Sequence, residues 1–198
     1  MGLDSVILLQ EVEDYFEITI PNDVAEKIVT VGDFSSYVHK HITLQTAEKC
    51  KTQVLFYKVR EFFCNELGLS KSEITPRTIL ENIVKIDIRK DVWVKLENHL
   101  ALKLPKLSKV DSTGKPAIVY KFFGLKKVKS EDGLFNHTIG ELISWITSLN
   151  YNTLFDKNGL CSERDVQLVL LGFVSEKLSV PIEEVKLESS FTSDLGID

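Results

Sequence analysis

Apolar residues recur at helical spacing in several stretches of the chain, and polar loops rich in glycine, serine or proline separate them. The middle of the chain predicts a long helix at about 52–67, an apolar-anchored loop, a helix at 90–102 and a last helix at 138–149. The ends predict two helices within 1–38, and a helix followed by a loop at 162–191. We therefore expect a mainly all-α protein whose short helices depend on packing against one another.

Two pairs of segments repeat one another. TVGDFSSYV at 30–38 and TIGELISWI at 138–146 share one pattern, which predicts a short helix capped by a threonine with an acid in its first turn. VREFFCNELGLSKSEITPRTIL at 59–80 runs parallel to LLGFVSEKLSVPIEEVKLESSF at 170–191 with a constant offset of 111. Each of these longer segments predicts an amphipathic helix that continues into a loop with apolar anchors.

The repeated parts occur in different orders, which is the pattern of a circular permutation. The middle has the first helix, the loop, the second helix and the last helix in sequence, whereas the ends have the second and last helices before the first. We expect residues 1–45 and 162–198 to form one discontinuous four-helix bundle, and 46–161 to form a second bundle inserted between its halves. The end segments then join within one molecule or are exchanged between two molecules.

Three segments resemble the acyl carrier protein family when they are taken in permuted order: ERDVQLVLLGFVSEKLSVPIEEVKLESSF (163–191), FTSDLGID (191–198) and LDSVILLQEVEDYFEITIPNDVAEKIVTVGDFSSYV (3–38). The inserted unit resembles the family only in outline and looks degenerate. The resemblance implies a carrier of fatty-acid or polyketide-type metabolism that presents or binds acyl chains and is not an enzyme. It also implies a serine that carries 4′-phosphopantetheine and a phosphopantetheinyl transferase that attaches this group.

In that family the acidic second helix binds acyl-transferring or condensing enzymes. The resemblance places this helix at the start of the chain, where Glu11, Glu13, Asp14 and Glu17 predict an exposed acidic strip. Such a strip would steer basic partners toward the bundle. We therefore expect these four carboxylates to form the partner-docking surface.

The spacing of the attachment serine is the main difference from the family. There the serine precedes a phenylalanine by about fourteen residues, or roughly four helical turns. Counting back from Phe16 gives Gly2, next in permuted order to Asp198, and glycine has no hydroxyl. Ser5 lies in an imitation of the motif, GLDS, and is the one serine worth testing, although it lies about one turn further along. In the inserted unit the equivalent residue is Ile88.

The absent serine leaves two alternatives to a working carrier. One is a carrier-like interaction or scaffold module that is never loaded. The other is a rearranged or trimmed form of a functional carrier.

Charge is unevenly distributed along the chain. Residues 1–38 contain eight acids and one base, and 162–198 contain eight acids and three bases, so that with a net charge of −5 the middle carries +7. The insertion at 103–133 contains eight lysines between Lys103 and Lys129, with Asp111 as the single acid between these two residues, and a candidate hairpin strand, AIVYKFF. This insertion is either a solvated loop or a docking surface for an acidic protein. A nucleic-acid role is disfavoured by a pI of about 5.5.

Other functional classes find little support in the sequence. The three cysteines have neither metal-ligand nor disulfide spacing, which favours a reducing cytoplasm. We find no glycine-rich phosphate loop, metal-ligand set or catalytic triad pattern, and no apolar run long enough to span a membrane.

Overall fold

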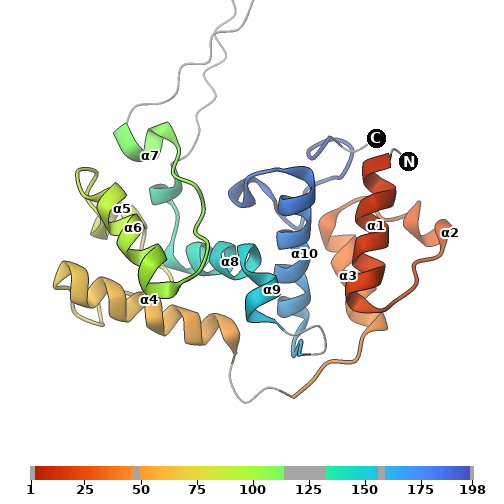
Figure 1. Ribbon diagram of the computed structural model, residues 1–198, viewed down its shortest axis with the longest axis horizontal. Helices are drawn as coiled ribbons and strands as arrows, with labels where there is room; N and C mark the ends of the chain where they lie inside the picture. Colours follow the sequence, from red (N-terminus) through yellow and green to blue (C-terminus); the bar gives the residue numbers. More distant parts are fainter. Residues whose placement is uncertain (1–2, 47–49, 114–132, 156–158, 197–198) are drawn as a thin grey trace, which may run out of the picture. The chain divides into compact units, whose positions relative to one another are not determined.

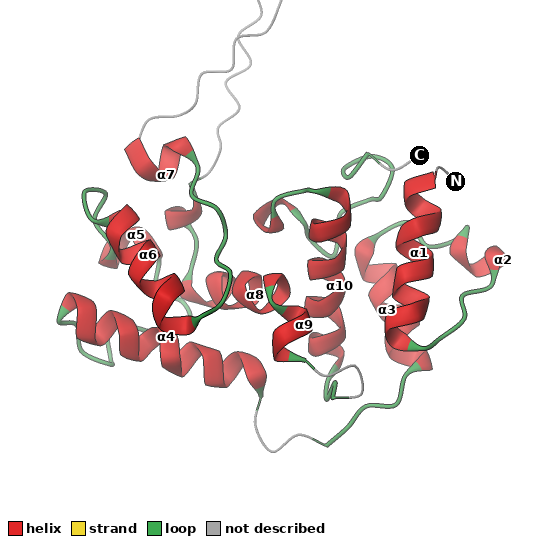
Figure 2. Cartoon of the chain, in the orientation of Figure 1, coloured by secondary structure: helices red, strands yellow, loops and turns green. Residues whose placement is uncertain are grey.

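The computed structural model describes residues 3–46, 50–113, 133–155 and 159–196, and within these ranges the regular elements are helices (Figure 2). They are α1 (Leu3–Phe16), α2 (Asn22–Ala25), α3 (Val31–His41), α4 (Lys51–Leu67), α5 (Leu80–Ile83), α6 (Arg89–Leu100), α7 (Lys109–Thr113), η1 (Leu134–Asn136), α8 (Ile139–Leu149), α9 (Tyr151–Leu154), α10 (Glu163–Leu178) and η2 (Ile182–Glu184) (Figure 1). The predicted all-α class is confirmed. Most of the 103–133 insertion, including the candidate hairpin, lies outside the described residues.

The chain divides into two compact units, and the first of them is discontinuous. Unit 1 comprises Met1–Lys51 and Ser144–Asp198, and unit 2 comprises Thr52–Ile143. The sequence predicted a discontinuous unit of 1–45 and 162–198, so the structure adds the segments 46–51 and 144–161 to it. The second boundary falls inside α8, and the C-terminal half of that helix therefore belongs to unit 1.

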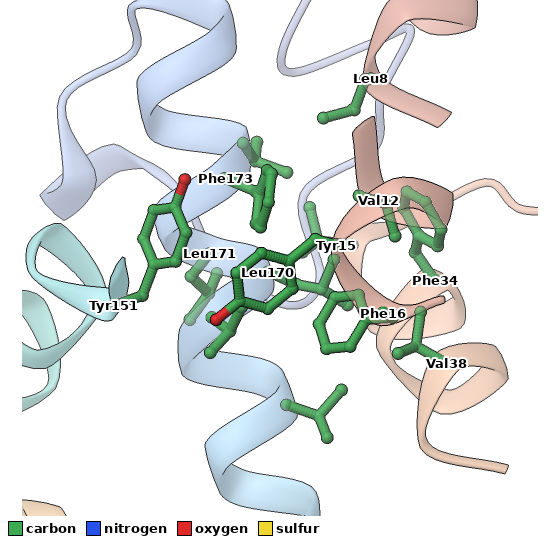
Figure 3. Close-up of a cluster of buried hydrophobic side chains, with 14 of the residues drawn as sticks. Leu8, Val12, Tyr15, Phe16, Phe34, Val38, Tyr151, Leu170, Leu171 and Phe173 are labelled. Atoms are coloured by element: carbon green, nitrogen blue, oxygen red, sulfur yellow. The ribbon is translucent and has the colours of Figure 1, made fainter. Parts of the chain in front are cut away.

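The core of unit 1 is built from helices at opposite ends of the chain. Its buried side chains include Leu8, Val12, Tyr15 and Phe16 of α1, Phe34 and Val38 of α3, and Leu170, Leu171 and Phe173 of α10 (Figure 3). The ring of Tyr15 packs edge-on against Phe173, with ring centroids 5.0 Å apart. The first and last thirds of the chain therefore bury their apolar faces against each other within one molecule.

A backbone junction fixes the start of α3 against the loop that follows α10. The amide of Val31 donates to the carbonyl of Ser189 at 3.2 Å, and the amide of Gly32 donates to Leu187 at 2.7 Å. The amide of Phe191 donates in the other direction, to the carbonyl of Val29 at 3.0 Å. These bonds satisfy amides of the first turn of α3, which have no partner within the helix.

Unit 2 contains the same junction between α8 and the loop that follows α4. The amide of Ile139 donates to Thr78 at 2.9 Å, the amide of Gly140 donates to Pro76 at 2.8 Å, and the amide of Leu80 donates to His137 at 3.0 Å. On the loop side each residue lies 111 positions before its counterpart in unit 1, and on the helix side 108 positions after it. The repeat found in the sequence is therefore also a repeat of backbone hydrogen bonds.

Glycine is required at the equivalent position of both junctions. A Cβ on Gly32 would lie 3.0 Å from the carbonyl oxygen of Leu187, and a Cβ on Gly140 would lie 2.9 Å from that of Pro76. Both distances are shorter than ordinary van der Waals contact, so a side chain would push the loop off the helix. This close approach explains the glycine that both repeat segments place two residues after a threonine.

Matching of these junctions makes α10 the counterpart of α4, and α3 the counterpart of the first part of α8. Along the chain, unit 2 therefore presents its parts as α4, α6 and α8, whereas unit 1 presents α1, α3 and then α10. The helix that comes first in unit 2 comes last in unit 1.

In unit 1 the segment 144–155 forms a cover on α10 that the sequence did not predict. The residues after the boundary in α8, together with α9, pack on α10 through Trp145, Leu149, Tyr151 and Phe155. Gly172 allows the contact, because a Cβ there would lie 2.1 Å from the carbonyl oxygen of Ser148. The phenol of Tyr151 donates to a carboxylate oxygen of Glu176 at 3.1 Å, and this bond holds α9 against α10.

Candidate functional site

The candidate site lies where the start of α1 meets the segment that follows η2, at one end of unit 1 (Figure 1). Phe191 and Leu195 of this segment pack on the same core as Leu8 of α1. The rings of Phe34 and Phe191 lie edge to face with centroids 6.1 Å apart. The two sequence fragments that resemble halves of one carrier motif are therefore anchored to a common core.

Ser5 supplies a hydroxyl within the first turn of α1 and is half-buried. The first amides of a helix have no intrahelical acceptor, and the helix dipole adds partial positive charge, so this position suits a phosphodiester. The hydroxyl and the helix start together fit the chemistry of a phosphopantetheine attachment. Gly2 and Asp198, the other two residues of the predicted seam, lie outside the described residues.

Exposed apolar side chains flank Ser5 on α1. Val6 is 47% exposed and Ile7 is 42% exposed, although the same helix buries Leu8 and Val12 completely or nearly so. Large apolar side chains that adjoin one another at the surface are typical of sites that bind a partner or ligand.

The acidic strip predicted on α1 is only partly exposed. Asp14 and Glu17 are exposed, as expected. Glu11 is half-buried and accepts from the Lys177 ammonium at 2.8 Å, and Glu13 accepts from the backbone amide of Ile20 at 2.6 Å. The expectation of four exposed carboxylates was wrong for these two, because Glu11 ties α1 to α10 and Glu13 holds the chain that leaves α1.

Unit 2 has a different arrangement at the equivalent helix start. Ile88 precedes α6 and has no hydroxyl, and the next residue, Arg89, places its guanidinium carbon 4.3 Å from the centre of the Phe135 ring. The same guanidinium donates to the backbone carbonyl of Asp111 at 3.4 Å. The start of α6 in unit 2 is therefore occupied by the packed side chain of Arg89.

Asp111 belongs to this packed arrangement as a structural carboxylate. It is 1% exposed and accepts from the amide and the hydroxyl of Ser108, at 2.9 and 2.7 Å. Its other oxygen lies 3.4 Å from the amide of Phe135, which donates to it. Buried carboxylates require such donors, so Asp111 serves the fold of unit 2.

Two further properties limit the chemistry of the described residues. They contain no group of three or more histidine, cysteine, aspartate or glutamate side chains that could hold a metal ion. No helix in the described part of the chain has both the length and the apolar character needed to cross a membrane.

The fold and the site together define a helical bundle, in which an acidic helix begins beside a loop anchored to the same core. Comparison with known proteins supports this class. The chain is 45% identical over 41 residues to the acyl carrier protein of Karelsulcia muelleri (strain GWSS). The match covers 21% of this chain and 49% of that protein, so the chain spans about half the length of the curated relative. No family model and no solved structure matches the chain.

The comparison therefore establishes an acyl-carrier-like relationship over part of the chain.

Proposed function

We propose that this chain is an acyl-carrier-type protein of fatty-acid or polyketide-type metabolism, rather than an enzyme, and that unit 1 is its carrier bundle. The observation that carries the proposal is the core of unit 1. There α1 and α3 from one end of the chain and α10 from the other bury their apolar faces together, in a chain with acyl-carrier-like sequence. A circular permutation of a carrier, with a degenerate unit inserted, accounts for the order of these helices. We place this carrier in the cytoplasm.

In this proposal Ser5 holds the phosphopantetheine group through its hydroxyl, and the N-terminal amides of α1 favour the phosphodiester. The group, when bound, would carry an acyl chain as a thioester. Asp14 and Glu17 attract the basic surfaces of acyl-transferring or condensing enzymes, while the exposed Val6 and Ile7 contribute apolar contact. Glu11 and Glu13 act by holding α1 in place.

Intact-protein mass spectrometry tests this proposal. The chain would be incubated with coenzyme A and a permissive phosphopantetheinyl transferase, and the modified residue would be mapped by fragmentation. We expect one added arm at Ser5 in the wild type and none in Ser5→Ala, with unchanged helical circular dichroism in both. Ser36→Ala, which removes an exposed serine from α3, is the matched control.

An unloaded interaction module is the second candidate function. The spacing that gives Gly2 in place of the attachment serine favours it, as do Ile88 and the packed Arg89 in unit 2. The absence of any mass gain in a folded wild-type chain, combined with binding of acyl-handling enzymes that Asp14→Lys/Glu17→Lys abolishes, would support this alternative over the loaded carrier.

A further inference from the structure

The outer face of α4 combines apolar, aromatic and basic side chains at the surface of unit 2. Val54, Tyr57, Lys58 and Glu61 have the i, i+3, i+4, i+7 spacing of one helix face. Val54 is 38% exposed and Tyr57 is 47% exposed. The guanidinium carbon of Arg60 lies 4.9 Å from the centre of the Tyr57 ring. This cation–π contact orders both side chains, which lowers the entropy cost of binding a partner.

The internal repeat shows that the same helix face is covered in unit 1. The offset of 111 places Asp165, Leu168 and Leu171 of α10 at the positions of Val54, Tyr57 and Arg60. Leu168 is fully buried, and Leu171, which is 9% exposed, belongs to the core cluster of unit 1. One copy of the repeat therefore uses this face for packing, and the other copy leaves it exposed within the described part of the chain.

Three basic side chains outnumber the one acid, Glu61, on and beside the α4 face, which favours an acidic occupant. Lys58 and Arg60 form no ion pair with any described residue, and Lys51 adds a third positive charge at the start of the helix. A partner surface that matches this face would have exposed apolar side chains next to unpaired carboxylates.

The exposed stripe of α1 has this composition. Val6, Ile7, Gln10 and Asp14 are exposed and follow helical spacing along the outer side of α1, and Glu17 is exposed at the residue that follows the helix. Asp14 and Glu17 form no ion pair with any described residue, in contrast to Glu11. Apolar and acidic groups on α1 thus complement apolar and basic groups on α4.

We propose that the α4 face of one chain binds the α1 stripe of a second copy of the same chain. The contact joins two different surfaces, so a pair of chains closes into a dimer when each contributes both surfaces, and longer assemblies form when the second contact is not closed. Both surfaces are exposed and charged, so the association is expected to weaken as salt screens the carboxylates and the basic groups. The two chains can associate in this way whether or not a group is attached to Ser5.

Sedimentation velocity with charge-reversed variants tests this proposal on the full chain. The α4 variant is Lys58→Glu/Arg60→Glu, and the α1 variant is Asp14→Lys/Glu17→Lys. We expect the wild type to self-associate at low salt and to become monomeric at high salt. Each variant alone should stay monomeric, because like charges then face each other. An equimolar mixture of the two should associate again, because every α4–α1 contact between the two different variants joins opposite charges.

Two control variants change the net charge by the same amounts at exposed positions elsewhere: Lys71→Glu/Lys85→Glu in unit 2 and Glu26→Lys/Glu188→Lys in unit 1. They should self-associate like the wild type, and circular dichroism should show equal helicity throughout. A wild type that stays monomeric at low salt overturns the proposal. A mixture of the α4 and α1 variants that fails to associate also overturns it, and binding of a foreign acidic helix to α4 would then assign this face to another partner.

Discussion

Single buried positions in unit 1 show how strictly its helices are packed. Ser35 on α3 is 1% exposed, and its hydroxyl oxygen has no hydrogen-bond partner among the described residues. A buried hydroxyl without a partner loses its hydrogen bonds to water and gains nothing in return.

Ser35→Ala is therefore expected to stabilise unit 1. The free energy of unfolding should rise by about 0.5–1 kcal/mol, because an unsatisfied hydroxyl is removed and alanine favours the helix. Urea denaturation followed by circular dichroism measures the change. Ser36→Ala, at an exposed position of the same helix, isolates the propensity contribution, and equal effects at both positions would contradict the burial argument.

Gly172→Ala should have the opposite effect from Ser35→Ala. Alanine normally favours a helix, but at this position in α10 it should destabilise the protein. The added Cβ would meet the carbonyl oxygen of Ser148 at 2.1 Å, so the end of α8 must shift away from α10. Overpacking of this kind costs about 1–3 kcal/mol. We expect Gly172→Ala to lower the urea midpoint and to speed hydrogen exchange in 144–155, and an increase in stability would show that this segment does not pack on α10.

The same capped helix start occurs in both units. Thr30 and Asp33 form a capping box at α3, with the Thr30 hydroxyl accepting from the Asp33 amide at 3.1 Å. Thr138 and Glu141 repeat it at α8, where the Thr138 hydroxyl accepts from the Glu141 amide at 3.2 Å. The predicted threonine caps are confirmed in both units.

Protonation should weaken both caps. The hydrogen bonds from the Thr30 hydroxyl and amide hold the pKa of Asp33 below its usual value. At Glu141 burial raises the pKa, but bonds from Thr138 and His137 outweigh this effect and leave the pKa lowered. A lowered folded-state pKa stabilises the protein above the unfolded-state pKa, and this contribution is lost as the pH falls through the folded-state value.

Removal of either cap is expected to cost about 1 kcal/mol at neutral pH. Thr30→Ala should act on unit 1 and Thr138→Ala on the α8 junction. Both costs should shrink as the pH falls through the lowered folded-state pKa of Asp33 or Glu141, because the wild-type carboxylate then loses its charge. Denaturation curves at a series of pH values below 7 test this, and a cost that does not depend on pH would show that the carboxylates contribute nothing to the caps.

At the scale of the whole chain, periodicity predicted most of the helices, and the repeated segments predicted which helices correspond. The structure supplies the reason: the junction hydrogen bonds require glycine, a capping threonine and apolar anchors at fixed spacing, and these leave a strong signal in the sequence. The cover on α10 left only a weak signal, an isolated glycine in an apolar helix. The ion pair of Glu11 with Lys177 and the hydrogen bond of Glu13 with the amide of Ile20 could not be predicted, because tertiary folding brings these partners together.

Deletion of 162–198 tests the discontinuous unit directly. Without α10 the apolar faces of α1 and α3 have no partner, and helices of this length are marginal alone. We expect hydrogen exchange to show complete loss of protection in 1–38, while 52–100 keeps its protection. Retained protection in 1–38 would contradict the assembly of unit 1 from both ends of the chain.

The distance along the chain between the two halves of unit 1 sets the order in which the protein acquires its structure during synthesis. The ribosome releases 52–143 as a continuous segment, so unit 2 can fold as soon as it emerges. The apolar faces of α1 and α3 must wait until α10 has been translated, more than a hundred residues later. Nascent chains stalled before α10 should therefore bind chaperones through their N-terminal segment. Chains that have left the ribosome with α10 complete should not.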